Sequence, residues 1–123
     1  MSALLAHLIG DFCLQSQSMA DRKTTSLPWA CLHAALYTMP FVLLTHDLWR
    51  LGVIFGTHAV IDRYRLAARW VAFYGTGTRA AGLWSRFNVS TEPVPAFLAV
   101  WLTIIVDQTF HLCINQWVLA WQT

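Results

Sequence analysis

Charged side chains are scarce in this sequence. Of its 123 residues, 11% are charged and 57% are apolar, whereas a soluble domain usually carries about 25% charged residues. This composition excludes an ordinary soluble protein and indicates an integral membrane protein of one domain. We expect its main partner to be the lipid bilayer and expect no binding of nucleic acid.

Cysteine is also rare, and the spacing of the three cysteines does not match a disulfide or metal-binding motif. Cys13, Cys31 and Cys113 fall inside apolar stretches and form no CxxC motif, so we expect small buried hydrophobic residues rather than disulfides or thiolate ligands. The N-terminal stretch lacks a basic region, which argues against a cleaved signal peptide. The sequence contains no HExxH motif and no nucleophile elbow.

Four apolar stretches are separated by short polar connections and one longer loop. A helix of about 20 apolar residues can cross a bilayer. The predicted fold is therefore an all-α integral membrane four-helix bundle, one domain over residues 1–123. Pro28 suits the first turn of the second helix, Pro40 should kink it, and the tight connection at 46–50 predicts an antiparallel hairpin with the third. The predicted spans are about 2–20, 28–45, 48–69 and 96–118, with a loop over about 70–95.

The basic residues predict the orientation of this bundle. All but one of the eight lysines and arginines lie after the first or the third predicted span, and the exception is Arg50. Because cytoplasmic loops are enriched in Lys and Arg, the loop over 70–95 should be cytoplasmic and both termini should lie outside. Trp29, Trp49, Trp70 and Trp117 fall near predicted helix ends, as an interfacial aromatic belt requires.

Ionisable residues nevertheless recur inside the apolar stretches. Each costs roughly 2.5–3.5 kcal/mol at the centre of a membrane helix, so each needs a partner in the protein interior. They form three pairs at i,i+4: His7 with Asp11, His58 with Asp62, and Asp107 with His111. The order reverses in the last span, which runs the opposite way. The three histidines should therefore form one layer and the three aspartates a deeper one, with His33 nearer the aspartates.

Imidazole and carboxylate groups in such layers are ligands of first-row metals. We expect a divalent ion, with zinc the best fit and manganese or iron as alternatives. The candidate metal ligands are His7, Asp11, His33, His58, Asp62, Asp107 and His111. Asp62 and Asp107 are the candidate catalytic groups, which would move protons. The alternative is that each pair is an interhelical hydrogen-bond clamp without a metal.

These motifs together resemble a known family. The motifs are His7-Leu-Ile-Gly-Asp11-Phe-x-Leu-Gln15, His58-x-Val-Ile-Asp62 and Asp107-Gln-x-x-His111. The set resembles an uncharacterised bacterial and bacteriophage family of small multi-spanning membrane proteins, a domain of unknown function. The resemblance implies a multi-pass protein of the bacterial inner membrane. More loosely, the intramembrane HxxxD pattern is similar to that of bacterial membrane-bound metal-dependent hydrolases.

Several functions follow from these features. The leading hypothesis is a metal-dependent hydrolase acting on a lipid-linked or phosphorylated substrate. A non-enzymatic phage or bacterial protein that binds or occludes a host membrane protein is a second class. A proton or ion conduit, or a haem carrier, is a third. The GVIFG stretch from Gly52 to Gly56 favours close helix packing, and we expect a homo-oligomer.

Overall fold

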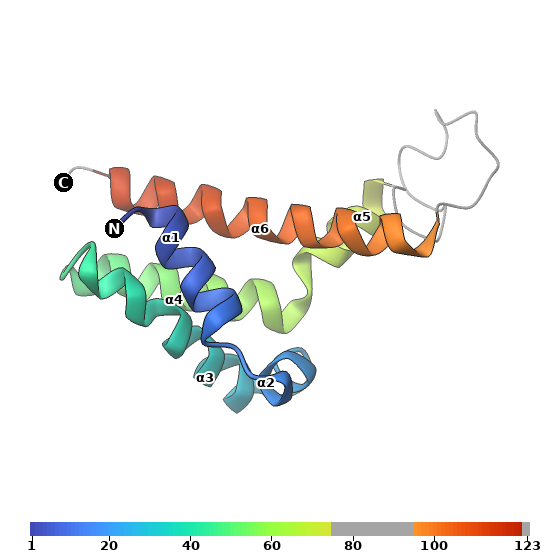
Figure 1. The fold of residues 1–123 in the computed structure, drawn as a ribbon, viewed down its shortest axis with the longest axis horizontal. Helices are drawn as coiled ribbons and strands as arrows, with labels where there is room; N and C mark the ends of the chain where they lie inside the picture. The colour runs from blue at the N-terminus through green and yellow to red at the C-terminus, as the bar shows by residue number, and fades with distance from the viewer. Residues whose placement is uncertain (75–94, 122–123) are drawn as a thin grey trace. The chain divides into compact units, whose positions relative to one another are not determined.

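The computed structural model describes residues 1–74 and 95–121, and every regular element in these residues is helical (Figure 1). The predicted all-α class is therefore confirmed. The described residues divide into two compact units, Met1–Tyr64 with His111–Thr123 (unit 1) and Arg65–Phe110 (unit 2). The elements are α1 (Ala3–Leu8), the π-helix η1 (Ile9–Cys13), α2 (Gln17–Arg22), α3 (Leu27–Thr38), the 3-10 helix η2 (Met39–Leu43), α4 (Leu48–Tyr64), α5 (Leu66–Tyr74) and α6 (Ala96–Ala120).

Short polar side chains set where several helices begin. The Oγ atoms of Ser2 and Ser16 each accept a hydrogen bond from the backbone N–H three residues further on, at 3.2 and 3.3 Å. Oδ1 of Asp47 accepts the N–H of Trp49 at 2.9 Å. Each of these side chains satisfies one of the donors that a helix start leaves without an intrahelical partner.

Two predicted helices are each broken in two. The helix expected over 2–20 stops at the end of η1, and α2 begins anew after its Ser16 cap. The helix expected over 48–69 is interrupted at Arg65, whose φ of 51° lies in the left-handed region and ends α4. Part of the predicted 70–95 loop is helical, since α5 continues to Tyr74, and residues 75–94 lie outside the described part of the chain.

The other two predicted helices are close to those observed. α3 has Pro28 in its first turn, as expected. The helix then tightens into η2 at Pro40, because proline cannot donate the hydrogen bond that would continue the α-helix. α6 covers Ala96–Ala120 without interruption. At the position where a kink was predicted, the structure therefore shows a change of helix type.

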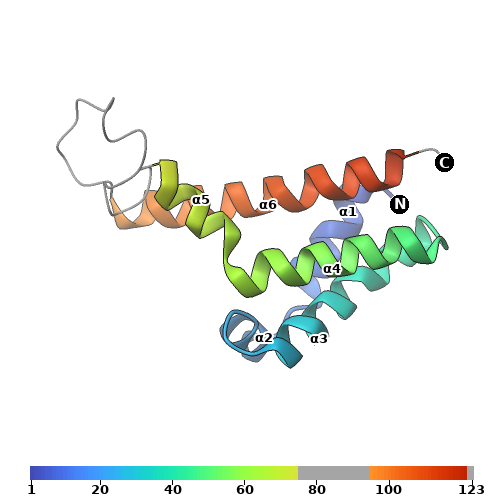
Figure 2. The same cartoon turned by 180° about the vertical axis from the view of Figure 1, so that it is seen from behind.

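Within unit 1, α3 and α4 form the predicted antiparallel hairpin (Figures 1 and 2). The start of α1 and the end of α6 lie at the same end of this unit (Figure 1). At that end, Nη2 of Arg50 donates a hydrogen bond to the carbonyl oxygen of Trp121 at 2.7 Å. The connection before α4, the start of α1 and the end of α6 thus lie at one end of unit 1, but only α6 among the described helices is long and apolar enough to cross a membrane, so the predicted four spans are not confirmed.

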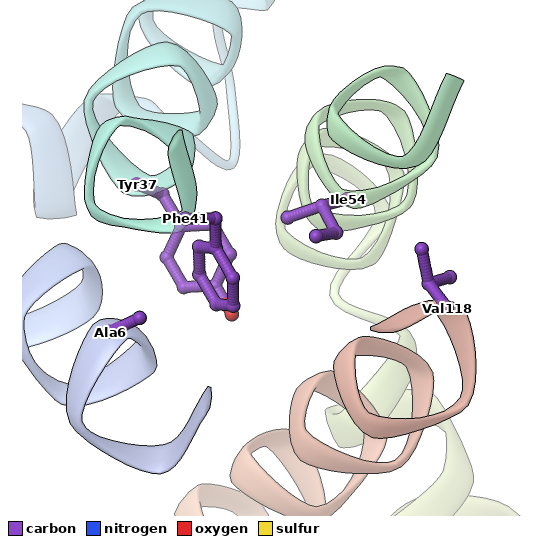
Figure 3. Close-up of a cluster of buried hydrophobic side chains, with 5 residues drawn as sticks. All are labelled: Ala6, Tyr37, Phe41, Ile54 and Val118. Atoms are coloured by element: carbon purple, nitrogen blue, oxygen red, sulfur yellow. The ribbon is translucent and has the colours of Figure 1, made fainter. Parts of the chain in front are cut away.

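A small apolar cluster joins the helices of unit 1 near this end (Figure 3). Tyr37 and Phe41 point from the α3–η2 segment into the space between the helices, toward Ala6 of α1 and Ile54 of α4. Val118 of α6 completes the cluster, and all five side chains are buried. The core is thus small and is shared by four helical segments.

Many large apolar side chains lie on the outer surface of the described residues. Leu43 and Leu48 are 76% and 83% exposed, and many other large apolar side chains are also exposed. The expectation that the cysteines are buried is wrong for Cys13 and Cys113, which are exposed on outward helix faces. By contrast, the buried residues include several histidines and aspartates. The described part of the chain thus combines an apolar core with a group of buried ionisable side chains, which soluble proteins rarely bury unless they are paired.

Unit 2 contains α5 and the first part of α6. Ala67 and Val71 of α5 are buried, and the Trp70 and Phe110 rings meet edge to face with centroids 5.8 Å apart. Asp107 belongs to this unit.

Candidate metal centre

The buried faces of the unit 1 helices carry the polar residues. On α3, the buried positions are Ala30, His33, Ala34 and Tyr37, which follow the i, i+3, i+4, i+7 spacing of one helix face. On α4, His58 and Asp62 lie on the same buried face. Alanine at the intervening positions of α3 lets neighbouring helices come close, and this closeness brings polar groups of different helices into contact.

Asp11 is presented by the π-helix η1, and Gly10 makes that placement sterically feasible. A Cβ atom at Gly10 would lie 2.7 Å from the carbonyl oxygen of Tyr37 and 2.9 Å from its Cα. Only a residue without a side chain permits this approach of η1 to α3. π-Helical turns are rare and occur often at functional sites, and here the turn directs the carboxylate of Asp11 inward.

Four residues from three helical segments bring their ligand atoms together. One ligand atom each from Asp11, His33, His58 and Asp62 lies within 4.8 Å of every other, and all four residues are buried. Nε2 of His33 lies 3.3 Å from Oδ1 of Asp11 and 3.3 Å from Oδ2 of Asp62. The predicted proximity of His33 to the aspartates is therefore confirmed. We call these four residues the His/Asp centre.

Within this centre, close approach does not coincide with hydrogen bonding. Nε2 of His58 and Oδ2 of Asp62 are 3.2 Å apart, but they are not in hydrogen-bonding geometry with each other. With its proton on Nδ1, His58 would present the lone pair of Nε2 beside the carboxylate oxygen of Asp62. Such an arrangement favours a cation there.

Lys23 brings a positive charge to the centre. Its Nζ lies 2.8 Å from Oδ2 of Asp62, 3.3 Å from Nε2 of His33 and 4.0 Å from Oδ1 of Asp11. The lysine follows α2 directly, and its side chain is 16% exposed against 3% for Asp62. The ammonium therefore offsets the carboxylate charge and links the buried centre to the surface.

His111 supports His58 and Asp62 from α6. Nδ1 of His58 and Nδ1 of His111 form a hydrogen bond at 3.2 Å, and Nε2 of His111 faces Oδ1 of Asp62 at 3.5 Å. A metal on Nε2 of His58 would leave the proton on Nδ1, which would then donate to Nδ1 of His111. Outer partners of this kind orient metal-binding imidazoles.

Tyr37 organises the side of the centre that faces α1 and α6. Its hydroxyl accepts a hydrogen bond from Nδ2 of Asn115 at 2.6 Å and bonds Nδ1 of His7 at 2.7 Å. Because Asn115 is the donor in the first bond, the hydroxyl proton is available to His7 in the second. The Tyr37 ring also stacks on the imidazole of His58, with centroids 3.6 Å apart and planes 16° apart. This contact fixes the plane of the imidazole.

The seven predicted ligands thus occupy different places. Four of them form the His/Asp centre, and His111 contacts two of those four. His7 bonds to Tyr37 instead and is not among the four. Asp107 belongs to unit 2 and is not counted in the centre. His46 is exposed in the connection before α4, as the sequence indicates for a turn residue.

Three polar residues of this region were not predicted as site residues. Lys23 is one of the basic residues after the first predicted span, which in the sequence indicate only the topology. Tyr37 and Asn115 carry no charge at neutral pH and were not selected. The signal that finds them is spacing, because Tyr37 follows His33 by four residues and Asn115 follows His111 by four.

A separate cavity of about 310 Å³ lies at the end of unit 1 that holds the connection before α4. Its lining includes Arg50, Trp117 and Trp121, and none of the four residues of the His/Asp centre. The candidate centre is therefore a cluster of buried donors rather than part of this cavity.

The structure defines an all-helical protein with a buried His/Asp cluster and, among the described residues, one helix long and apolar enough to cross a membrane, α6. The chain belongs to the family described as Protein of unknown function (DUF3307), whose family model matches residues 1–122. The resemblance to an uncharacterised family is confirmed to this extent. No curated protein and no solved structure matches the chain.

Proposed function

We propose that this chain is an integral membrane protein whose His/Asp centre binds one divalent metal ion. The observation that carries the proposal is the convergence of Asp11, His33, His58 and Asp62 in a buried site. Two imidazoles and two carboxylates are a donor set that suits zinc and also accepts manganese or iron.

The distances within the centre support a tetrahedral ion. Metal–ligand bonds of about 2.0–2.1 Å in a tetrahedron place neighbouring ligand atoms about 3.3–3.4 Å apart. The separations of Nε2 of His33 from the two aspartate oxygens are both 3.3 Å, and that between His58 and Asp62 is 3.2 Å. The separation of His58 from Asp11 is 4.0 Å, so this pair would have to close by about 0.6–0.7 Å to reach the tetrahedral spacing.

The distribution of polarity supports the membrane setting. Buried histidines and aspartates beneath an exposed apolar surface suit a lipid environment, where ionisable residues face the protein interior. α6 is long enough to cross a bilayer and is mostly exposed. Leu27–Leu43, formed by α3 and η2, is apolar and has 17 residues, the lower limit for a crossing. As a helix, Ala3–Cys13 would be only about 16 Å long, roughly half the thickness of the hydrocarbon core. We therefore propose that this segment enters the membrane but is too short to cross it.

We further propose hydrolysis of a lipid-linked or phosphorylated substrate as the reaction, in the bacterial inner membrane. A divalent ion polarises a phosphoryl oxygen and lowers the pKa of a bound water. The chain's own contribution would be to hold the ion with two imidazoles and two carboxylates in a buried site. The positive charge of the ion suits an anionic substrate.

One observation favours a second candidate, a purely structural role. Nζ of Lys23 already lies within ion-pair distance of Asp62 and Asp11. The cluster can therefore hold three helical segments together as a buried ion-pair network without any metal. Metal content separates these two functions.

We expect elemental analysis of detergent-purified protein to find one zinc, manganese or iron ion per chain. His58→Ala should reduce the metal content at least tenfold, because it removes one of four ligands. His46→Ala is the matched control and should retain the metal, since His46 is exposed and outside the centre. Equal metal content in both variants would show that the ion binds elsewhere.

Topology can be tested by cysteine labelling in a background in which the three native cysteines are replaced. We expect cysteine introduced at Thr25 to react from the cytoplasmic side and cysteine at His46 to react from outside. The two positions flank the α3–η2 segment, which must cross the membrane in the proposed arrangement. Labelling of both from the same side would rule out that crossing.

A further inference from the structure

Lys23 stands out because it approaches the same atoms that would bind the metal. Its Nζ lies 2.8 Å from Oδ2 of Asp62 and 3.3 Å from Nε2 of His33, and it is 4.0 Å from Oδ1 of Asp11. These are three of the four ligand atoms of the His/Asp centre. An ammonium at these distances occupies the side of the site at which these three atoms would bind a metal ion.

A divalent ion and this ammonium cannot share that side of the site. An ion bound to the three atoms would sit about 2.0–2.2 Å from each, which places two like charges a few ångströms apart in a buried site. The carboxylate oxygens that now offset the ammonium would also be committed to the ion. Both effects favour the departure of Lys23 when metal binds.

The position of Lys23 in the chain allows its side chain to leave the centre and extend toward solvent. It follows the last residue of α2, and the segment from there to the start of α3 is short and partly exposed. The side chain is 16% exposed, more than its carboxylate partners, and a lysine stem can extend toward water from that point.

Building on the proposed metal centre, we infer that Lys23 is an internal counter-cation that a divalent ion displaces, and that it sets the metal affinity of the site. Without metal, the ammonium pairs with Asp62 and Asp11 and keeps the two carboxylates together. With metal, the ion takes over this role and the lysine side chain moves toward the surface.

The affinity test uses zinc and a competing chromophoric chelator with the purified, metal-free full chain. Lys23→Met, which keeps length but removes charge, should bind zinc at least tenfold more tightly than the wild type. Arg22→Met is the matched control and should change affinity less than twofold, because Arg22 lies over the ring of Trp29 and outside the centre. Equal or weaker zinc binding by Lys23→Met overturns the inference.

A second measurement on the wild-type chain does not depend on the folding of any variant. Lys23 is the only lysine in the sequence, so acetylation of its Nζ can be followed by mass spectrometry. Zinc should increase the acetylation rate at least fivefold, and an unchanged or slower rate would contradict displacement. If the wild type binds zinc but neither expected effect appears, only this inference fails. If neither wild type nor Lys23→Met binds zinc, the proposed metal centre fails as well.

Discussion

Replacing Asp62 with asparagine should abolish metal binding and markedly destabilise the fold. Asp62 is the most connected carboxylate of the centre: its oxygens face Lys23, His33, His58 and His111 at 2.8–3.5 Å. The substitution removes one metal ligand and leaves the mostly buried ammonium of Lys23 with only the more distant Asp11. Removal of one partner from a buried ion pair lowers the free energy of unfolding by about 3–5 kcal/mol. For Asp62→Asn we expect a decrease of about 3 kcal/mol.

The measurement is reversible unfolding in mixed micelles, combined with zinc titration. Asp21→Asn is the matched control, since Asp21 is exposed and its Oδ1 accepts a hydrogen bond from Nε2 of Gln17 at the surface. This substitution should change the free energy of unfolding by no more than about 0.5 kcal/mol. If Asp62→Asn is as stable as the Asp21 variant, the carboxylate does not hold the centre together.

Gly10→Ala is expected to be equally damaging for a steric reason. The added Cβ would lie 2.7 Å from the carbonyl oxygen of Tyr37, a backbone atom that cannot move away without shifting α3. Overpacking of this kind costs about 3 kcal/mol. The shift would also displace the adjacent Asp11 from the centre, so zinc affinity should fall together with stability.

Two other glycines provide the control for this prediction. Gly52 and Gly56 lie within α4, and a Cβ at either position meets nothing within 4 Å. Alanine there should stabilise the helix by about 0.5–1 kcal/mol, because glycine is a poor helix former. If thermal unfolding shows Gly10→Ala to be as stable as the alanine variants at Gly52 and Gly56, the close approach of η1 to α3 is contradicted.

The centre could be predicted from the sequence because polar groups in an apolar helix must find partners. The i,i+4 spacing of His58 and Asp62 places them on one helix face whatever the exact helix ends, and His33 was correctly placed near the aspartates. The spacing could not show which residues share one ligand set. His7 has the same spacing to Asp11, but its imidazole bonds to Tyr37 instead.

The role of Lys23 could not be read from its surroundings in the sequence. It follows Arg22 in a polar connection, where a basic residue also explains membrane topology. Its contact with the centre depends on how α2 folds back against α3, and tertiary packing decides that arrangement.

Helix boundaries were the least predictable part of the fold. Apolar composition continues through residues 48–69, but Arg65 adopts a left-handed conformation that ends α4. No sequence rule favours arginine in that conformation, which glycine or asparagine would adopt more readily. The π-helix at Ile9–Cys13 also departs from the 3.6-residue period on which helix prediction depends.

X-ray absorption spectroscopy at the zinc edge on zinc-loaded, detergent-purified protein tests the central claim most directly. The account predicts one zinc per chain with four nitrogen and oxygen ligands at about 2.0–2.2 Å, at least two of them from imidazole, and no sulfur ligand. The signal should be lost in the His33→Ala and Asp62→Asn variants. A zinc ion bound by the sulfur of Cys13 or Cys113, or bound equally well by both variants, would contradict a His/Asp metal centre.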